Sequence, residues 1–285
     1  MKGGVIICRF ISQPLFMLQH LAGYILAVII GLSLGLIGGG GSILTVPVLV
    51  YLMGTDPVLA TTYSLFIVGC TSLAGGTKAY MNRLVDFSSV SLFGIPSILT
   101  VFIARHFILP HIPEIIFTIG SMEVTKGRFL MMIFALLMLV AALSMMRNDG
   151  KETVTPENTT TRHDKPLSLF IPGLLTGLVT GLLGAGGGFL IIPALVLFVK
   201  LPMKTAVGTS LLIIAINACF GFVFSIGHFY FDWSLLLPFT ALAVTGVFAG
   251  SIIAERMNGE ALKKWFGWFV LAMSVFIMAK EILLP

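Results

Sequence analysis

Charged residues are scarce in this sequence. Aspartate, glutamate, lysine and arginine make up 10% of its 285 residues, whereas a soluble domain contains about 25%. This scarcity excludes an ordinary soluble protein. Instead, 57% of the residues are hydrophobic, and they form apolar runs along the whole chain. Runs of about 17 to 25 apolar residues are long enough to cross a bilayer as helices. The sequence therefore predicts an all-α polytopic membrane protein that is integral to the membrane and crosses it several times.

Residue types that carry catalysis or metal binding are also few. The chain has three cysteines and five histidines. Cys70 and Cys219 lie within apolar segments, and the histidines are scattered, so neither a disulfide framework nor a metal-ligand spacing emerges. The sequence contains no Ser, His and Asp set and no pair of carboxylates at a spacing typical of catalysis. We therefore expect a protein that is not an enzyme and that uses no metal or cofactor. The net charge of +5 is spread over short connecting segments, which argues against a nucleic acid partner.

Ten apolar segments divide into two sets of five. A polar stretch with glycine, proline and charges of both signs separates the sets, and we interpret it as a solvated linker. The predicted organisation is a first transmembrane half over residues 1–147, a linker over 148–166 and a second transmembrane half over 167–285. The apolar segments run approximately over residues 15–37, 43–54, 58–76, 87–109, 128–147, 167–183, 189–199, 203–226, 234–254 and 263–284.

The two halves are similar in sequence. When the chain is shifted by 146 residues, Gly31–Ser88 aligns with Gly177–Ser234 without a gap, and 18 of the 58 aligned positions are identical. We interpret this similarity as two homologous structural repeats, of the kind on which secondary transporters are built. If each half crosses the membrane five times, the halves must be inverted relative to each other.

Each half also contains a run of glycines inside apolar sequence. GLIGGGGSILTVP begins at Gly35, and GLLGAGGGFLIIP begins at Gly181. Glycine is unfavourable inside a helix by about 1 kcal/mol relative to alanine, so each run predicts a helix break. The segment after the first run, Ile43–Gly54, is too short to span a bilayer. Interrupted segments at matching places point to a transporter's binding site, where a helix N-terminus can hold an anion. The alternative is that the glycines serve only close helix packing.

Polar residues on the next segment of each half extend this hypothesis. Ser64 and Thr71 are seven residues apart and share a helix face, as do Ser210 and Asn217 in the second half. They would line the pathway or form hydrogen bonds between helices. The candidate substrate-binding residues are Gly38, Gly39, Gly40, Gly41, Ser42, Ser64, Thr71, Gly184, Ala185, Gly186, Gly187, Gly188, Ser210 and Asn217.

Charged residues near segment ends allow two interpretations. Asp86 and Asp232 occupy matching positions. An acid within the membrane would couple transport to a proton or cation, whereas an acid at the start of a helix would cap it. Basic residues near segment ends are expected to extend their side chains to the membrane interface. These residues are Lys78, Arg83, Arg105, Lys200 and Lys204.

The two glycine motifs, together with AVGTSLLI over Ala206–Ile213, resemble the signature of the TauE/SafE family of sulfite and organosulfonate exporters. The resemblance extends from about Gly23 to the last apolar segment. It implies a permease of the bacterial or archaeal inner (plasma) membrane that carries small sulfur-containing anions as a secondary transporter. The halves differ at two aligned positions, where Ala185 stands opposite Gly39 and Thr62 stands opposite Gly208. These differences leave the substrate selectivity open.

We therefore expect an anion exporter whose partners are its substrate and the lipid bilayer; whether it forms a homo-oligomer is left open. Helix N-termini at the two glycine breaks would hold the anion, and one half would rock against the other to give alternating access. Two alternatives are a transporter of another cargo, such as a carboxylate or a metal ion, and a membrane sensor or structural protein without transport activity.

Overall fold

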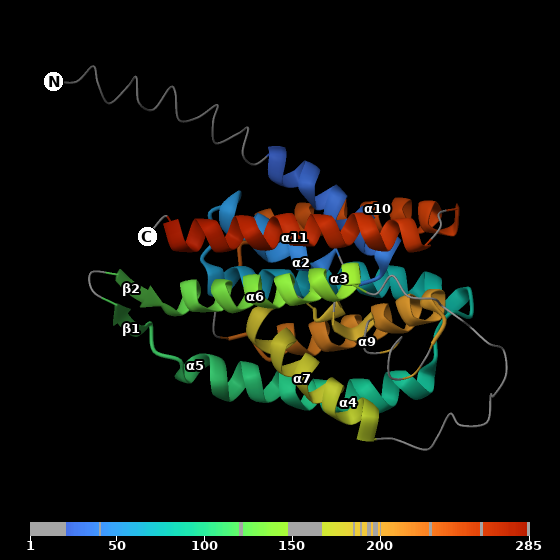
Figure 1. Ribbon diagram of the computed structural model, residues 1–285, viewed down its shortest axis with the longest axis horizontal. Coiled ribbons are helices and arrows are strands. Elements are labelled where there is room, and N and C mark those ends of the chain that lie inside the picture. The colour runs from blue at the N-terminus through green and yellow to red at the C-terminus, as the bar shows by residue number, and fades with distance from the viewer. Residues whose placement is uncertain are drawn as a thin grey trace.

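The computed structural model describes residues 21–39, 41–119, 122–147, 167–184, 186–188, 190–192, 195, 199, 201–227, 230–256 and 259–283. The predicted linker over 148–166 lies outside these ranges, as do Gly40, Ala185 and Lys200. In the described part most residues are helical, and long helices lie side by side along the long axis of the molecule (Figure 1). This architecture agrees with the helical membrane protein that the composition predicts.

The described helices follow the predicted apolar segments closely. Helix Leu21–Ile37 comes first. The other elements are α2 Ser42–Tyr51, α3 Pro57–Met81, α4 Phe87–Ile103, the π-helical turn η1 Ala104–Ile108, α5 Leu109–His111, β1 Ile115–Ile119, β2 Met122–Thr125, α6 Lys126–Arg147, α7 Leu167–Leu183, α9 Met203–Val223, α10 Trp233–Arg256 and α11 Gly259–Leu283.

Four of the helical segments are long and apolar enough to cross a membrane. They are Pro57–Met81, Phe87–His111, Lys204–Val223 and Trp233–Ala254. The second of these segments joins α4, η1 and α5 without interruption. Together with shorter apolar helices such as Leu21–Ile37, they make the chain an integral multi-pass membrane protein.

Two pairs of helices begin at residues that are 146 positions apart in the sequence. α3 and α9 begin at Pro57 and Met203, and α4 and α10 begin at Phe87 and Trp233. Two starts have clear local causes: Asp56 accepts hydrogen bonds from the N–H groups of Val58 (2.9 Å) and Leu59 (3.2 Å) before α3, and Asp232 accepts one from the Ser234 N–H (3.0 Å) before α10. The shared spacing therefore extends from the sequence to the elements that it forms.

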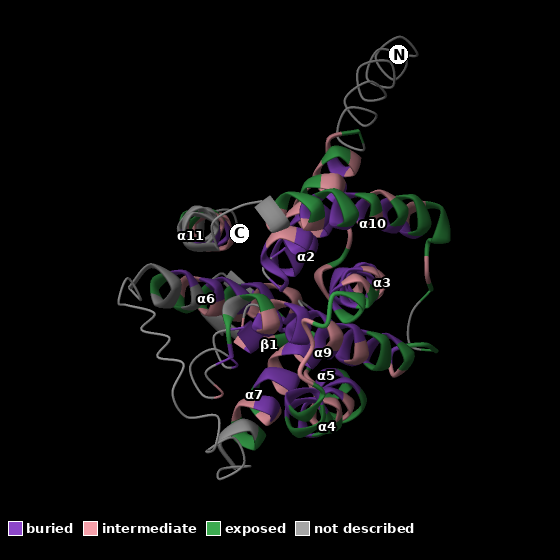
Figure 2. Ribbon diagram, turned by 90° about the vertical axis from the view of Figure 1, so that its right-hand side faces the viewer, coloured by how far each residue is buried: buried purple, intermediate pink, exposed green. Residues whose placement is uncertain are grey.

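Helices α3 and α9 form the antiparallel centre of the bundle. A Cβ atom on Gly75 would lie 3.2 Å from the side chain of Leu211, and one on Gly221 would lie 3.0 Å from that of Leu65, so the contacts run in opposite chain directions. In the 18-residue apolar windows of α3 and α9, 67% of the residues are buried, against 39% in the windows of the α4 and α10 segments. Figure 2 shows this difference as buried ribbon on α3 and α9 and exposed outer faces on α4 and α10.

Glycines allow two further helix pairs to approach closely. Gly31 and Gly35 of helix Leu21–Ile37 abut the backbone of Ala243 and Val247 in α10. In the same way, α7 abuts α4, where a Cβ atom on Gly177 would lie 2.2 Å from the carbonyl oxygen of Ser97. Small residues at such contacts are typical of membrane helix packing. The first helix of each half thus packs on a helix of the other half.

A two-stranded hairpin departs from the all-α expectation. Strands β1 and β2 pair antiparallel, with Ile119 opposite Met122, and they extend at the end of the molecule between α5 and α6 (Figure 1). α5 ends at His111 because Pro113 disfavours a helical conformation in the residue before it. The residues that follow, Ile115–Ile119 and Met122–Thr125, pair as strands.

Candidate functional site

Both glycine runs lie where helices end and new helices begin. Gly38 and Gly184 have positive φ angles of 85° and 68°, a conformation that favours glycine. Their N–H groups donate to the carbonyl oxygens of Leu34 (2.8 Å) and Thr180 (2.9 Å), which closes the last turn of the preceding helices. We call Gly38, Gly39 and Gly41 the first glycine turn, and Gly184 with Gly186, Gly187 and Gly188 the second glycine turn.

The two glycine turns touch each other. A Cβ atom on Gly39 would lie 2.4 Å from the Cα atom of Gly188, so the two backbones are in direct contact. Gly186 lies between the central helices, because its Cβ atom would meet Val68 of α3 at 2.6 Å and Ile214 of α9 at 2.9 Å. We call the contact between Gly39 and Gly188 the junction. It brings together two segments that are about 150 residues apart in the sequence.

Neighbouring protein atoms occupy the positions where side chains at these glycines would lie. A Cβ atom on Gly184 would lie 2.1 Å from the carbonyl oxygen of Thr61, and one on Gly41 would lie 2.4 Å from the backbone nitrogen of Leu34. A Cβ atom on Gly187 would lie 2.2 Å from Thr180 Oγ1. The glycines therefore serve close packing in this conformation, which is the alternative that the sequence left open beside ligand binding.

Helix α2 starts at the junction. Its first residues, Ser42, Ile43 and Leu44, are buried. No side chain caps the helix, and the Ser42 hydroxyl donates to the carbonyl oxygen of Gly39 at 2.7 Å rather than accepting from a helix N–H. A helix leaves its first N–H groups without intrahelical acceptors. The start of α2 therefore directs a partial positive charge into the interior of the bundle.

The predicted polar residues on α3 and α9 are all buried. Thr71 Oγ1 donates to the carbonyl oxygen of Ile67 at 2.7 Å, and Ser210 Oγ donates to that of Val207 at 2.8 Å. Asn217 Nδ2 donates to Ser97 Oγ on α4 at 2.6 Å, which is the interhelical bond that the sequence suggested for this group. Within the described ranges, Ser64 Oγ and Asn217 Oδ1 have no hydrogen-bond partner, so both can accept one from a ligand or water.

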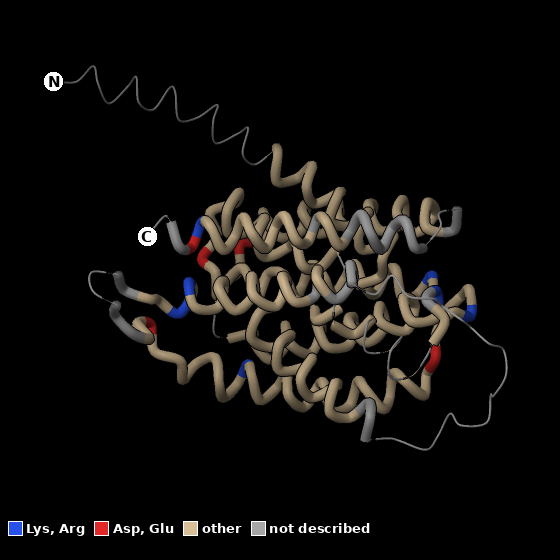
Figure 3. Tube along the Cα trace, viewed as in Figure 1, with Lys and Arg blue, Asp and Glu red and all other residues tan. Residues whose placement is uncertain are grey.

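The two aspartates lie at helix starts outside the membrane-spanning segments. Asp86 Oδ2 accepts a hydrogen bond from Ser89 Oγ at 2.6 Å, and Asp232 Oδ1 accepts one from the Ser234 N–H at 3.0 Å. The bonds from Ser234 lower the pKa of Asp232 below its usual value. Figure 3 shows that most charged residues gather near the two ends of the bundle. The geometry thus favours helix capping for Asp232, whereas the Asp86 side chain makes no capping bond to the start of α4, so that its role in coupling stays a prediction.

The expectation for Arg105 is wrong. Its side chain was predicted to extend to the interface, but Arg105 lies inside the segment Phe87–His111 and is only 3% exposed. Its Nη1 donates to Thr62 Oγ1 at 2.9 Å and its Nη2 to Thr61 Oγ1 at 3.1 Å. The apolar residues that continue after Arg105 are the sequence signal that places it within the segment.

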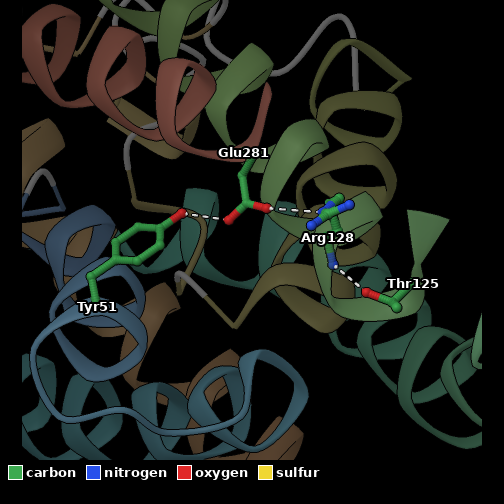
Figure 4. Close-up of polar contacts among 4 residues, drawn as sticks. All are labelled: Tyr51, Thr125, Arg128 and Glu281. Carbon is green, nitrogen blue, oxygen red and sulfur yellow. Dashed lines mark hydrogen bonds and ion pairs between the residues drawn. The ribbon is translucent and has the colours of Figure 1, made fainter. Parts of the chain in front are cut away.

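A polar cluster at the far end of α2 was not predicted. Tyr51 donates a hydrogen bond to Glu281 Oε1 at 2.8 Å, and Arg128 Nε lies 3.7 Å from Glu281 Oε2 (Figure 4). The Lys280 ammonium lies 3.9 Å from the centre of the Tyr51 ring. These contacts tie the last residue of α2 to α6 and α11. Sequence reasoning missed them because Tyr51 and Glu281 are 230 residues apart.

Comparison with known proteins places this chain among membrane transporters. A family model described as "Sulfite exporter TauE/SafE" matches residues 24–277. A "Probable membrane transporter protein" of Xylella fastidiosa (strain 9a5c) is 30% identical over 267 residues, which cover 88% of this chain and 91% of the relative. A protein of Bacillus subtilis (strain 168), named "Probable membrane transporter protein YunE", is 27% identical over 84% of this chain and 91% of its own. No solved structure matches the chain.

Proposed function

The chain belongs to the sulfite exporter TauE/SafE family of membrane transporters, and from this premise we propose that it exports small sulfur-containing anions, such as sulfite or organosulfonates, as a secondary transporter. The observation that carries the proposal is the junction, where two helix breaks meet between the central helices α3 and α9. Broken helices at the middle of a bundle are the usual place of a transporter's binding site.

The start of α2 supplies the chemistry that an oxyanion requires. The N–H groups of its first residues and the positive end of its dipole favour negative charge, and glycine backbone admits a ligand closely. In this conformation, protein atoms occupy the space beside the glycines of both turns. We therefore propose that the anion binds when the turns separate. Ser64 Oγ can donate a hydrogen bond to an anion oxygen, since it has no partner among the described residues.

We further propose that the halves are inverted repeats related by an approximate two-fold axis. Two hydrogen bonds support this relation. Their donor residues are 146 positions apart in the sequence, and so are their acceptor residues. The Asp86 N–H donates to Thr209 Oγ1 at 2.9 Å, and the Asp232 N–H donates to the Tyr63 hydroxyl at 2.7 Å. The antiparallel course of the equivalent helices α3 and α9 supports an axis that inverts one half relative to the other.

Ligand-dependent thermal stabilisation of the purified protein tests the function first, since a ligand that binds the folded state raises its apparent stability. Sulfite, sulfoacetate, taurine and thiosulfate are compared with acetate, phosphate and divalent metal ions. We expect stabilisation by sulfur anions alone, followed by flux of the same anions in proteoliposomes. Stabilisation and flux with carboxylates or metal ions only would contradict the sulfur-anion proposal and favour a transporter of another cargo.

A further inference from the structure

Arg105 is a buried cation inside a membrane-spanning segment. It lies in the π-helical turn η1 and is 3% exposed. Its two terminal nitrogens donate to the hydroxyl groups of Thr61 and Thr62, while its Nε has no acceptor in the described part of the chain. No carboxylate of the described residues forms an ion pair with it. Local π-helical turns frequently mark functional sites.

The charge of this guanidinium is not balanced by its neighbours. Arginine remains protonated in proteins, and hydroxyl groups accept hydrogen bonds without supplying negative charge. A charge that is buried without a partner is strongly unfavourable, and basic residues within membrane segments therefore mark substrate pathways or pair with an anion. The surroundings of Arg105 lack such an anion in the described ranges.

Thr61 links the guanidinium to the second glycine turn. A Cβ atom on Gly184 would lie 2.1 Å from the carbonyl oxygen of Thr61, the residue whose hydroxyl holds Arg105 Nη2. One turn earlier, a Cβ atom on Gly181 of α7 would lie 2.6 Å from the Cβ atom of Ala104. The N-terminal part of α3 thus abuts Gly184 of the second glycine turn, η1 abuts α7 just before that turn, and Arg105 bridges η1 and α3.

The hydrogen bonds of Thr61 orient the arginine. The Thr61 hydroxyl donates its proton to the carbonyl oxygen of Val58 at 2.7 Å, so it can only accept from Arg105. A guanidinium has five N–H groups, of which two are used here. The Nε–H and two further N–H groups stay available in a planar fork, a geometry that matches the oxygens of an oxyanion.

The second half lacks this arrangement. At a shift of 146 residues, Arg105 corresponds to Ser251, and Thr61 and Thr62 correspond to Val207 and Gly208. The Lys78 ammonium instead donates to Ser251 Oγ at 3.0 Å, and its side chain is only half-buried. Among the described residues at these matched positions, the strongly buried cation is therefore present in the first half alone.

We propose that Arg105 is the positively charged ligand of the transported anion, held beside the second glycine turn by Thr61 and Thr62. This assignment rests on the proposed function, because it requires an anionic cargo. It also accounts for the difference between Thr62 and Gly208, since the hydroxyl of Thr62 is one of the two that hold the guanidinium.

The test measures sulfite affinity, thermal stability without ligand, and flux for three variants. Arg105→Gln removes the charge, Arg105→Lys keeps it without the planar fork, and Lys78→Gln is the matched control for loss of a half-buried cation. We expect the affinity of Arg105→Gln to fall at least tenfold while its melting temperature without ligand stays equal or rises, because an unbalanced buried charge is removed. Arg105→Lys should retain part of the affinity, and Lys78→Gln should stay within about twofold of the wild type.

Two results would overturn the assignment. One is wild-type affinity and flux in Arg105→Gln. The other is a large fall in the melting temperature of both Arg105 variants together with wild-type sulfite affinity in the folded Arg105→Lys protein, because this combination is what a purely structural arginine would give. If instead the wild type binds a carboxylate and not a sulfur anion, and Arg105→Gln abolishes that binding, the sulfur cargo is wrong while the role of Arg105 stands.

Discussion

Gly39 and Gly186 illustrate how single residues control the junction. Gly39 contacts the backbone of Gly188, whereas Gly186 faces the side chains of Val68 and Ile214 with a φ angle of 67°. A valine at Gly186 would clash with both side chains and adopt an unfavourable backbone conformation. Such a substitution would disturb packing and transport together, so it could not separate the two roles of the glycine.

Alanine at Gly39 gives the first prediction. Its Cβ atom would lie 2.4 Å from Gly188 Cα, so the two turns must move apart, and overpacking of this kind destabilises a core by about 1 to 3 kcal/mol. We expect Gly39→Ala to lower the melting temperature and to abolish flux. Gly94→Ala is the matched control, because nothing lies within 4 Å of its Cβ position in α4. Wild-type stability and flux in Gly39→Ala would show that the turns do not need to touch.

At this scale the sequence predicts a helix break at each glycine run, and helix Leu21–Ile37 and α7 end one residue before Gly38 and Gly184; a pair of broken helices that forms a binding site stays a prediction. The contact between Gly39 and Gly188 could not be predicted, because it depends on how two distant segments pack. The same reason hid the position of Arg105, whose burial is produced by Thr61 and Thr62 of another helix.

At the scale of elements, Asp232 caps the start of α10. Asp232 accepts hydrogen bonds from both the N–H and the hydroxyl of Ser234, and these bonds lower its pKa. A lowered pKa in the folded state means that the stabilisation is complete above the ordinary pKa of a carboxyl group, near 4. It is then lost as the pH falls through the lowered value.

This capping role gives the second prediction. Asp232→Ala should be less stable than the wild type at neutral pH, and the difference should shrink on acidification because the wild type then loses its own bonds. Asp232→Asn, which keeps a capping oxygen, should retain wild-type flux and an unchanged dependence of flux on pH. Thermal melts between pH 3 and 7 and flux assays over the same variants decide the question. Loss of the pH dependence in Asp232→Asn would instead assign Asp232 to proton coupling.

The helices were easier to predict than the connections between them. Apolar length and composition gave the membrane-spanning segments, since helix formation in a membrane is enforced by the need to satisfy backbone hydrogen bonds. The hairpin of β1 and β2 was missed because it forms in the interval between two predicted apolar segments, where pairing of Ile119 with Met122 rather than hydropathy decides the structure.

At the scale of the whole molecule, the helices group differently from the sequence halves. Helix Leu21–Ile37 packs on α10, and the Asp232 N–H before α10 bonds to Tyr63 of α3. Likewise α7 packs on α4, and the Asp86 N–H before α4 bonds to Thr209 of α9. Two helix groups result, Leu21–Ile37 with α3 and α10, and α7 with α9 and α4. Each contains helices of both halves, so we expect movement between these groups in place of the predicted rocking of one half against the other.

The contact between α3 and α9 joins the two helix groups, and fixing it gives the last prediction. A Cβ atom on Gly69 of α3 would lie 3.4 Å from Cys219 Sγ of α9, which is close to the geometry of a disulfide. We expect Gly69→Cys to form this disulfide under mild oxidation and to lose flux, and reduction should restore the flux. The controls are the oxidised wild type, which also contains Cys70, and Gly69→Cys combined with Cys219→Ser. If the cross-linked protein transported at the wild-type rate, α3 and α9 would have to move as one body, and the moving contact would then lie outside the pair that encloses the junction.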